Sequence, residues 1–117
     1  MTVRIAIPEP TSLDAAYNDR SLRPYLEAIE AAGATPAVIP LRESRERVAQ
    51  GLAGIQGMLF PGSRYDVSPQ IYGEESIPEC APSDPARAAV DELLFRDAFH
   101  LQKPILAICY GVQALNV

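Results

Sequence analysis

Short apolar runs recur along the chain between longer amphipathic stretches. Residues 3–7 (VRIAI), 35–40 (TPAVIP) and 55–60 (IQGMLF) are short and rich in apolar or β-branched side chains. Such runs predict buried strands. A fourth run, residues 105–108, leads directly into Cys109. We therefore expect four strands, the last of which ends at a cysteine.

The stretches between these runs carry apolar positions at helical spacing. Ser21 is a candidate N-cap, Pro24 is tolerated in a first turn, and Gly33 is a natural helix end. Ser44 begins a more polar helix, and Asp84 followed by a proline begins another. The expected helices span residues 21–33, 44–52, 84–101 and 111–117.

The alternation of strands and helices predicts the fold class. Strand–helix order repeated along a chain indicates an α/β fold with a parallel, doubly wound sheet of the flavodoxin-like type. One long loop, residues 61–83, interrupts the alternation, and long loops in compact domains are more often functional than accidental.

Composition narrows the classes of partner and compartment. The 117 residues carry a net charge of -5 and no cluster of Lys and Arg, which argues against nucleic acid. No apolar run approaches the roughly 18 residues that a membrane helix needs. The N-terminal apolar stretch is too short for a signal peptide, so we expect a cytoplasmic protein in which Cys80 and Cys109 are free thiols.

Cys109 stands where a strand turns into a helix. This turn presents a side chain above the carboxyl edge of the sheet, and the helix N-terminus favours a thiolate. The backbone N–H of Tyr110 can point at a developing oxyanion. The tight turn needs small neighbours, which Gly111 and Ala107 supply. A buried structural cysteine at a strand end is the alternative.

Three blocks of sequence resemble the class I glutamine amidotransferase-like family, especially its γ-glutamyl hydrolase branch. PILAICYGVQALNV resembles that branch's nucleophile segment, P-[IV]-L-G-I-C-R-G-x-Q-x-[LM]-N-V. FPGSRYDVSPQIYGEE resembles its PGG/PGS loop and the stretch that follows it. DPARAAVDELLFRDAF resembles a helix that commonly reads D-P-x-R-D-x-x-E.

The resemblance implies a site residue by residue. Cys109 matches the nucleophile that forms a γ-glutamyl thioester. Gly62 and Ser63 match the loop whose backbone N–H, with that of Tyr110, forms the oxyanion hole. Gln113 matches the glutamine beside the γ-glutamyl group of the substrate. Asp66, Pro69 and Tyr72 match the loop motif without a definite role.

The resemblance implies a small γ-glutamyl amide as substrate. It implies no metal or organic cofactor. No His or Cys stands at ligand spacing from Cys80, so we expect Cys80 not to be a metal ligand. A homo-oligomer stays open as an alternative to a monomer.

Besides Ala107, where the pattern has Gly, three positions depart from the family pattern. Tyr110 replaces the usual Arg, Ala88 replaces a helix Asp, and Asp91 replaces a Glu. The first change leaves the backbone donor in place but is expected to alter the entrance to the pocket. Tyr110, Ala88 and Ala107 keep open a catalytically dead binding or regulatory domain. A cysteine protein of the ThiJ type is disfavoured by the PGS loop and Gln113.

A cysteine nucleophile needs a base, and the only histidine is His100. It precedes the last strand, so a crossover places it at the opposite edge of the sheet from Cys109. The family supplies its His and Glu from a later segment of a longer chain. We therefore expect residues 1–117 to be the N-terminal portion of one truncated amidotransferase-like domain, inactive alone, with the His and Glu downstream.

Overall fold

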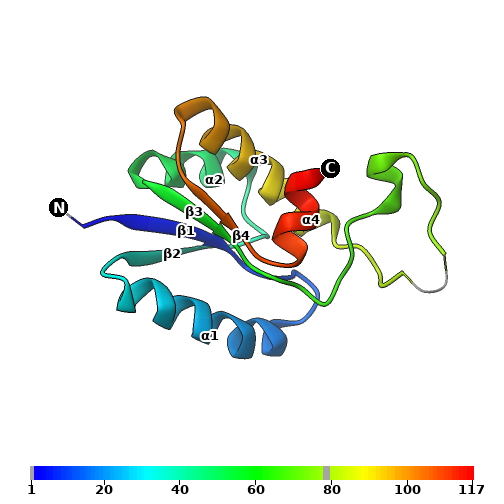
Figure 1. Cartoon of the computed structure of the whole chain (residues 1–117), viewed down its shortest axis with the longest axis horizontal. Coiled ribbons are helices and arrows are strands. Elements are labelled where there is room, and N and C mark those ends of the chain that lie inside the picture. The colour runs from blue at the N-terminus through cyan, green and yellow to red at the C-terminus, as the bar shows by residue number, and fades with distance from the viewer. Residues whose placement is uncertain (1, 78–79) are drawn as a thin grey trace.

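A computed structural model describes residues 2–77 and 80–117 and shows one sheet of parallel strands (Figure 1). The strand order is β2-β1-β3-β4, and all three pairings are parallel. The predicted α/β, doubly wound fold class is thereby confirmed. The strands are β1 (Arg4–Pro8), β2 (Thr35–Ile39), β3 (Gly57–Phe60) and β4 (Ile105–Ala107).

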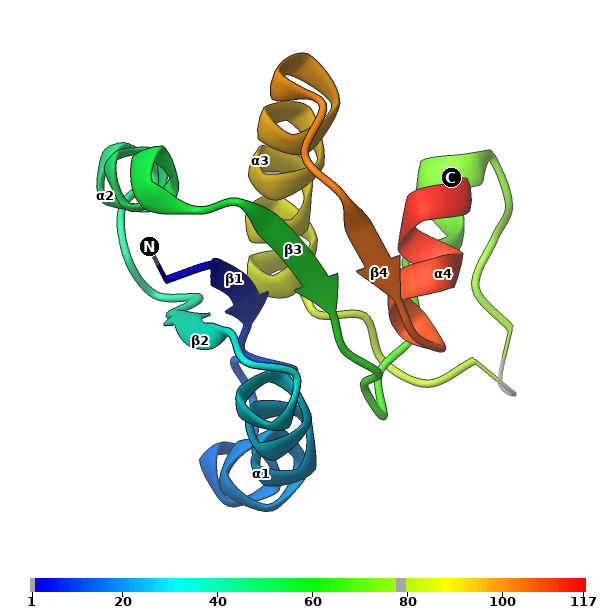
Figure 2. The ribbon, with the colours of Figure 1, turned by 60° about the vertical axis from the view of Figure 1, so that its left-hand side comes forward.

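Helices cover both faces of the sheet, as Figures 1 and 2 show. α1 packs on one face, α2 and α3 pack on the other, and α4 runs beside the N-terminal part of α3. The helices are α1 (Ala15–Ala31), α2 (Arg45–Gly51), α3 (Pro85–Leu101) and α4 (Tyr110–Asn116), with short 3-10 turns at Leu52–Gly54 and Pro69–Tyr72.

The two central strands divide their side chains between two cores. Successive residues of a strand point to opposite faces, so Ala6, Met58 and Phe60 lie under α2 and α3. Ile7 and Leu59 lie against α1. The ring of Phe60 stacks on that of Phe95 from α3, with 4.1 Å between centroids. Burial on both faces explains why these strands read as continuous apolar runs.

The predicted start of the first helix at Ser21 is wrong. α1 begins at Ala15, because the side chain of Asp14 caps it by accepting the N–H of Tyr17 at 2.9 Å. Pro24 therefore lies inside the helix, where it removes one backbone hydrogen bond.

The other helix starts follow the predicted caps. Ser44 Oγ accepts the N–H of Arg47, and Asp84 Oδ1 accepts the N–H of Arg87, each at 3.2 Å. Gln102 follows the last residue of α3, and its left-handed backbone (φ 56°, ψ 40°) turns the chain toward β4.

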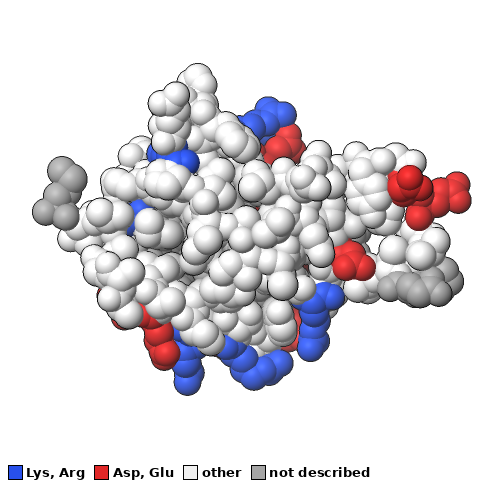
Figure 3. Space-filling view, viewed as in Figure 1, with Lys and Arg blue, Asp and Glu red and all other residues white. Residues whose placement is uncertain are grey.

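Charged side chains lie mostly toward the margins of the face in Figure 3, and the middle of that face, where β4 lies in Figure 1, shows few. Leu106 of β4 and Val112 of α4 are both at least half exposed. Within residues 2–77 and 80–117, no helix combines the length and the apolar character that crossing a membrane requires.

Candidate functional site

The carboxyl ends of the parallel strands point to one edge of the sheet, on the right in Figure 1. The loop after β1, the loop after β3 and the turn from β4 into α4 all start there. Open α/β sheets bind ligands at this edge. Cys109 stands in the last of these three connections, so the candidate site lies at this edge of the sheet.

Cys109 has an unusual backbone conformation. Its φ is 49° and its ψ is -109°, a region that residues with a Cβ rarely adopt. The residue is exposed and its thiol is free. A strained backbone at an exposed cysteine, between a strand and a helix, matches the geometry of a nucleophile elbow. The catalytic role of Cys109 itself stays a prediction.

Gly111 is required by the packing of the elbow. A Cβ on Gly111 would lie 2.4 Å from the carbonyl oxygen of Phe60 and 2.7 Å from its Cβ. The start of α4 therefore sits directly on the end of β3. Ala107 pairs with Phe60 across the sheet and is only partly buried, so a small residue with a Cβ fits there.

The loop after β3 comes close to the cysteine. A Cβ placed on Gly62 would lie 3.5 Å from the Cβ of Cys109 and 3.5 Å from the hydroxyl of Tyr25. The N–H of Gly62, a predicted oxyanion donor, donates to that hydroxyl at 3.1 Å. The hydroxyl of Tyr25 is a site group that the sequence pattern does not reveal, because it reaches Gly62 from α1, a segment distant in the sequence.

Two contacts hold the residues that directly follow Gly62. The hydroxyl of Ser63 accepts the N–H of Tyr65 at 3.2 Å and so closes a tight turn. Arg64 pairs with Asp14 at 3.3 Å and stacks over the ring of Tyr17. The loop is thereby tied to the first turn of α1.

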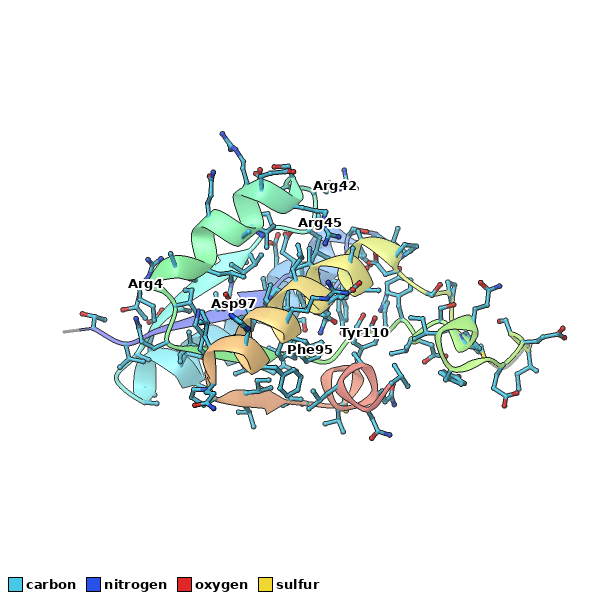
Figure 4. All side chains as sticks on the ribbon, turned by 90° about the horizontal axis from the view of Figure 1, so that it is seen from above. Arg4, Arg42, Arg45, Phe95, Asp97 and Tyr110 are labelled. Atoms are coloured by element: carbon cyan, nitrogen blue, oxygen red, sulfur yellow. The ribbon has the colours of Figure 1, made fainter. Side chains whose placement is uncertain are left out.

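Tyr110, directly after the cysteine, turns its ring inward. The residue is 3% exposed, and the guanidinium of Arg87 lies 4.6 Å from its ring centroid. Figure 4 shows Tyr110 between α3 and the start of α4. Burial, together with the charge of Asp91, raises the pKa of Tyr110 to about 12. The ring therefore packs beneath the elbow, and an effect of this side chain on the pocket entrance stays a prediction.

Arg87 is fully buried and has a partner for every side of its guanidinium. Nε donates to both carboxylate oxygens of Asp91, at 2.9 and 3.0 Å. Nη1 donates to the carbonyl of Pro10 at 2.9 Å, and Nη2 donates to the carbonyl of Pro61 at 2.8 Å. One side chain therefore links α3 to the loops after β1 and β3. The i,i+4 spacing of Arg87 and Asp91 on a predicted helix was the available signal.

Asp84 anchors the loop after β1 in a similar way. Its carboxylate accepts the hydroxyl of Thr11 at 2.5 Å, and the N–H and hydroxyl of Ser12 at 2.6 and 2.8 Å. Burial alone would raise the pKa of Asp84, but these hydrogen bonds outweigh it and lower the pKa. For Asp91 burial dominates over the attraction of Arg87 and raises the pKa to about 6.

Gln113 lies one turn after the cysteine, on the exposed side of α4. It lines a hollow of about 370 Å³ together with Asp66, Tyr72 and Cys80. The structure thus brings two residues of the matched loop motif, Asp66 and Tyr72, next to the predicted substrate-binding glutamine. Pro69 is buried at the start of the 3-10 turn and supports this loop.

His100 lies in the last exposed turn of α3, next to the amino end of β4. Cys109 follows the opposite, carboxyl end of the same strand. Among residues 2–77 and 80–117, no group of three or more His, Cys, Asp or Glu side chains is arranged to hold a metal ion.

The parallel sheet and the strained elbow define the class: an α/β protein with an exposed cysteine at a strand-to-helix turn. The particular family follows from comparison with known proteins. The sequence model of the Peptidase C26 family matches residues 6–117, nearly the whole chain. The chain belongs to that family.

Similar proteins come from several bacteria. A glutamine amidotransferase-like protein of Rickettsia prowazekii is 33% identical over 95 residues, which are 81% of this chain and 33% of that protein. The gamma-glutamyl-gamma-aminobutyrate hydrolase PuuD of Escherichia coli K12 is 34% identical over 94 residues, or 80% of this chain and 36% of the hydrolase. The chain spans between 30% and 48% of the length of the curated relatives it matches.

Proposed function

We propose that the protein provides the nucleophile half of a cysteine hydrolase that cleaves γ-glutamyl amides, with Cys109 as the attacking group. The observation that carries this proposal is the backbone of Cys109, with φ 49° at an exposed cysteine between β4 and α4. Folding alone gives no reason to keep a residue with a Cβ in that conformation.

The reaction divides into two steps. The Cys109 thiolate attacks the γ-carbonyl carbon, a sulfur–carbon bond forms, and the carbon–nitrogen bond breaks as the amine leaves with a proton. Water then attacks the thioester, releases glutamate and restores the thiol. The backbone N–H groups of Gly62, Ser63 and Tyr110 are the proposed donors to the oxyanion. For Gly62 this requires the substrate oxygen to replace the hydroxyl of Tyr25.

The base is proposed to come from outside these residues. His100 lies beside the amino end of β4 and Cys109 beyond the carboxyl end, so His100 is a poor partner for the thiol. A His and a Glu from a longer polypeptide would complete the triad. We therefore propose that residues 1–117 alone do not turn over substrate.

The substrate class rests on two supports. The relatives include proteins named gamma-glutamyl-gamma-aminobutyrate hydrolase, at 34% and 35% identity. Gln113, Asp66 and Tyr72 line one polar hollow a single helical turn from the cysteine. Amide and carboxylate groups there suit the amino acid end of a γ-glutamyl compound.

The experiment uses 6-diazo-5-oxonorleucine, a glutamine analogue with an electrophilic diazomethyl carbon in place of the side-chain amide nitrogen. The protein is incubated with it near neutral pH, and the modified residue is located by mass spectrometry. Modification of Cys109 with little at Cys80 supports the proposal. The reaction of the Cys80→Ala variant should be unchanged, and that of Cys109→Ala should be lost.

A catalytically dead binding domain is the alternative, and iodoacetamide distinguishes it. A nucleophile should be alkylated near neutral pH faster than Cys80, which is partly buried. Equal, slow alkylation of both cysteines, with no reaction of the glutamine analogue, would favour the binding domain.

A further inference from the structure

The strongest unexplained feature is the charge of Arg87 beneath the predicted site. The side chain has no solvent exposure, and its ion pair with Asp91 is equally buried. Burial of an ion pair gives little net stability and is often neutral when compared with apolar residues. Two of its hydrogen bonds go to backbone carbonyls of loops far away in the sequence, those of Pro10 and Pro61. These two contacts indicate that the guanidinium of Arg87 holds the two loops in place.

The contact with Pro61 bears on the predicted oxyanion donor. The carbonyl of Pro61 and the N–H of Gly62 belong to one planar peptide unit, which is trans. The two groups of a trans peptide point in opposite directions, so whatever holds the carbonyl also aims the N–H. Arg87 Nη2 binds the carbonyl at 2.8 Å on the inner side. The N–H consequently points away from Arg87 to the hydroxyl of Tyr25. A Cβ placed on Gly62 would lie 3.5 Å both from that hydroxyl and from the Cβ of Cys109, so the peptide lies close to the cysteine.

A second contact concerns Tyr110, another of the predicted donors. The same guanidinium lies over the ring of Tyr110, 4.6 Å from its centroid, and Tyr110 supplies the N–H directly after the cysteine. A charged guanidinium on a buried aromatic face is attractive and restricts the ring. Arg87 thus touches both segments that are proposed to bind the oxyanion, one from β3 and one from the elbow.

We propose that Arg87 is a positioning residue that sets the plane of the Pro61–Gly62 peptide and so aims the Gly62 N–H at the oxyanion of the substrate. The proposal rests on the proposed function in taking Cys109 as the nucleophile. Asp91 holds the guanidinium from the other side, through Nε, and leaves both Nη groups free for the two carbonyls.

Arg87→Lys tests the proposal. Lysine keeps the charge but lacks the planar fork that reaches Asp91 and two carbonyls at once. The reagent is 5-oxopentanoate, whose aldehyde adds the Cys109 thiol so that the thiol proton passes to the new hydroxyl oxygen. That oxygen needs the oxyanion donors, whereas alkylation by iodoacetamide does not. Affinity for the aldehyde is measured as protection of Cys109 from iodoacetamide.

We expect aldehyde binding to weaken at least 10-fold, since loss of one oxyanion donor costs about 100-fold or more in rate. The rate of alkylation without aldehyde should change less than about 3-fold. Arg96→Lys is the matched control: Arg96 stands on the same helix and pairs with Glu92 at 2.7 Å, but it is exposed. That variant should behave as wild type in both measurements.

Asp91→Asn is the second variant, for the case in which Arg87→Lys does not fold. It removes the charge that orients Nε while it keeps one acceptor, so a smaller loss in the same direction is expected. Unchanged aldehyde binding in both variants would overturn the proposal. A parallel loss of aldehyde binding and alkylation rate would also overturn it, because a purely structural role predicts that pattern.

Hydrogen exchange of the Gly62 amide separates this proposal from the proposed function. The Gly62 N–H is bonded to Tyr25, and a released peptide should exchange at least about 10-fold faster in Arg87→Lys, with Arg96→Lys unchanged. If wild-type Cys109 is not protected by the aldehyde, the oxyanion chemistry fails, while faster Gly62 exchange still supports the positioning. Unchanged exchange refutes the positioning whatever the aldehyde does.

Discussion

Replacement of Gly111 by alanine is the sharpest perturbation that the elbow offers. The added Cβ would meet the carbonyl oxygen of Phe60 at 2.4 Å and the Cβ of Phe60 at 2.7 Å. Both atoms belong to a fully buried residue of a central strand, so neither can swing away. Relief requires α4 to move outward by about 1 Å relative to β3.

The cost follows from that movement. Overpacking a tight site typically costs about 1–3 kcal/mol, and a clash with strand backbone belongs at the upper end, near 3 kcal/mol. In a chain of this size the melting temperature should fall by on the order of 10 °C. Displacement of α4 should also change the rate at which iodoacetamide modifies Cys109, since the cysteine is the residue before that helix.

Gly51→Ala provides the matched control. Gly51 closes α2, its backbone is helical, and a Cβ there meets no atom within 4 Å. Alanine in a helix is favoured over glycine by up to about 1 kcal/mol, so this variant should melt at or slightly above wild type. A Gly111→Ala protein that melts within about 2 °C of wild type, with unchanged Cys109 alkylation, would refute the described packing of α4 on β3.

Three further predictions concern stability. Asp84→Ala should lower the free energy of unfolding by about 2–4 kcal/mol, because it removes a helix cap and leaves buried donors unpaired. Ser44→Ala removes an exposed cap and should lower it by only about 1 kcal/mol. Urea unfolding of the two variants makes the comparison. Because burial raises the pKa of Asp91 from 3.8 to about 6, the folded protein holds that proton more tightly than the unfolded chain does. The stabilisation from this proton is thus present below about pH 4 and is lost as the pH rises to about 6. The free energy of unfolding of wild type relative to Asp91→Asn should therefore fall over this window by up to about 3 kcal/mol. A difference that does not change with pH would be the contrary result. Tyr25→Phe removes the acceptor of the Gly62 N–H and should cost about 1 kcal/mol in urea unfolding, with no loss at all counting against that bond.

Local patterns were enough to predict most elements of the fold. Apolar runs marked the strands because the central strands are buried on both faces. Asp84 and Ser44 marked helix starts because a cap needs only its own helix. The start of α1 was missed because Pro24 looked like a first-turn residue, while the actual cap is Asp14.

The site was only partly predictable. Cys109, Gly62 and the small residues of the elbow follow from local pattern and resemblance, and the structure brings that loop to the cysteine. Arg87 was not predicted to be buried, because an arginine on a helix is normally exposed. Its carbonyl partners stand 77 and 26 residues away and become neighbours only when β1 and β3 pair in the sheet.

The conformation of Cys109 also bears on how this chain can change over generations. At φ 49° and ψ -109° glycine would relieve about 1–3 kcal/mol of strain. Random substitution filtered by stability alone would therefore drift toward glycine at this position. A lineage that has lost its chemistry should show that drift first here, before its core residues change. Whether related sequences keep a cysteine at this position should therefore indicate whether their site has kept its chemistry.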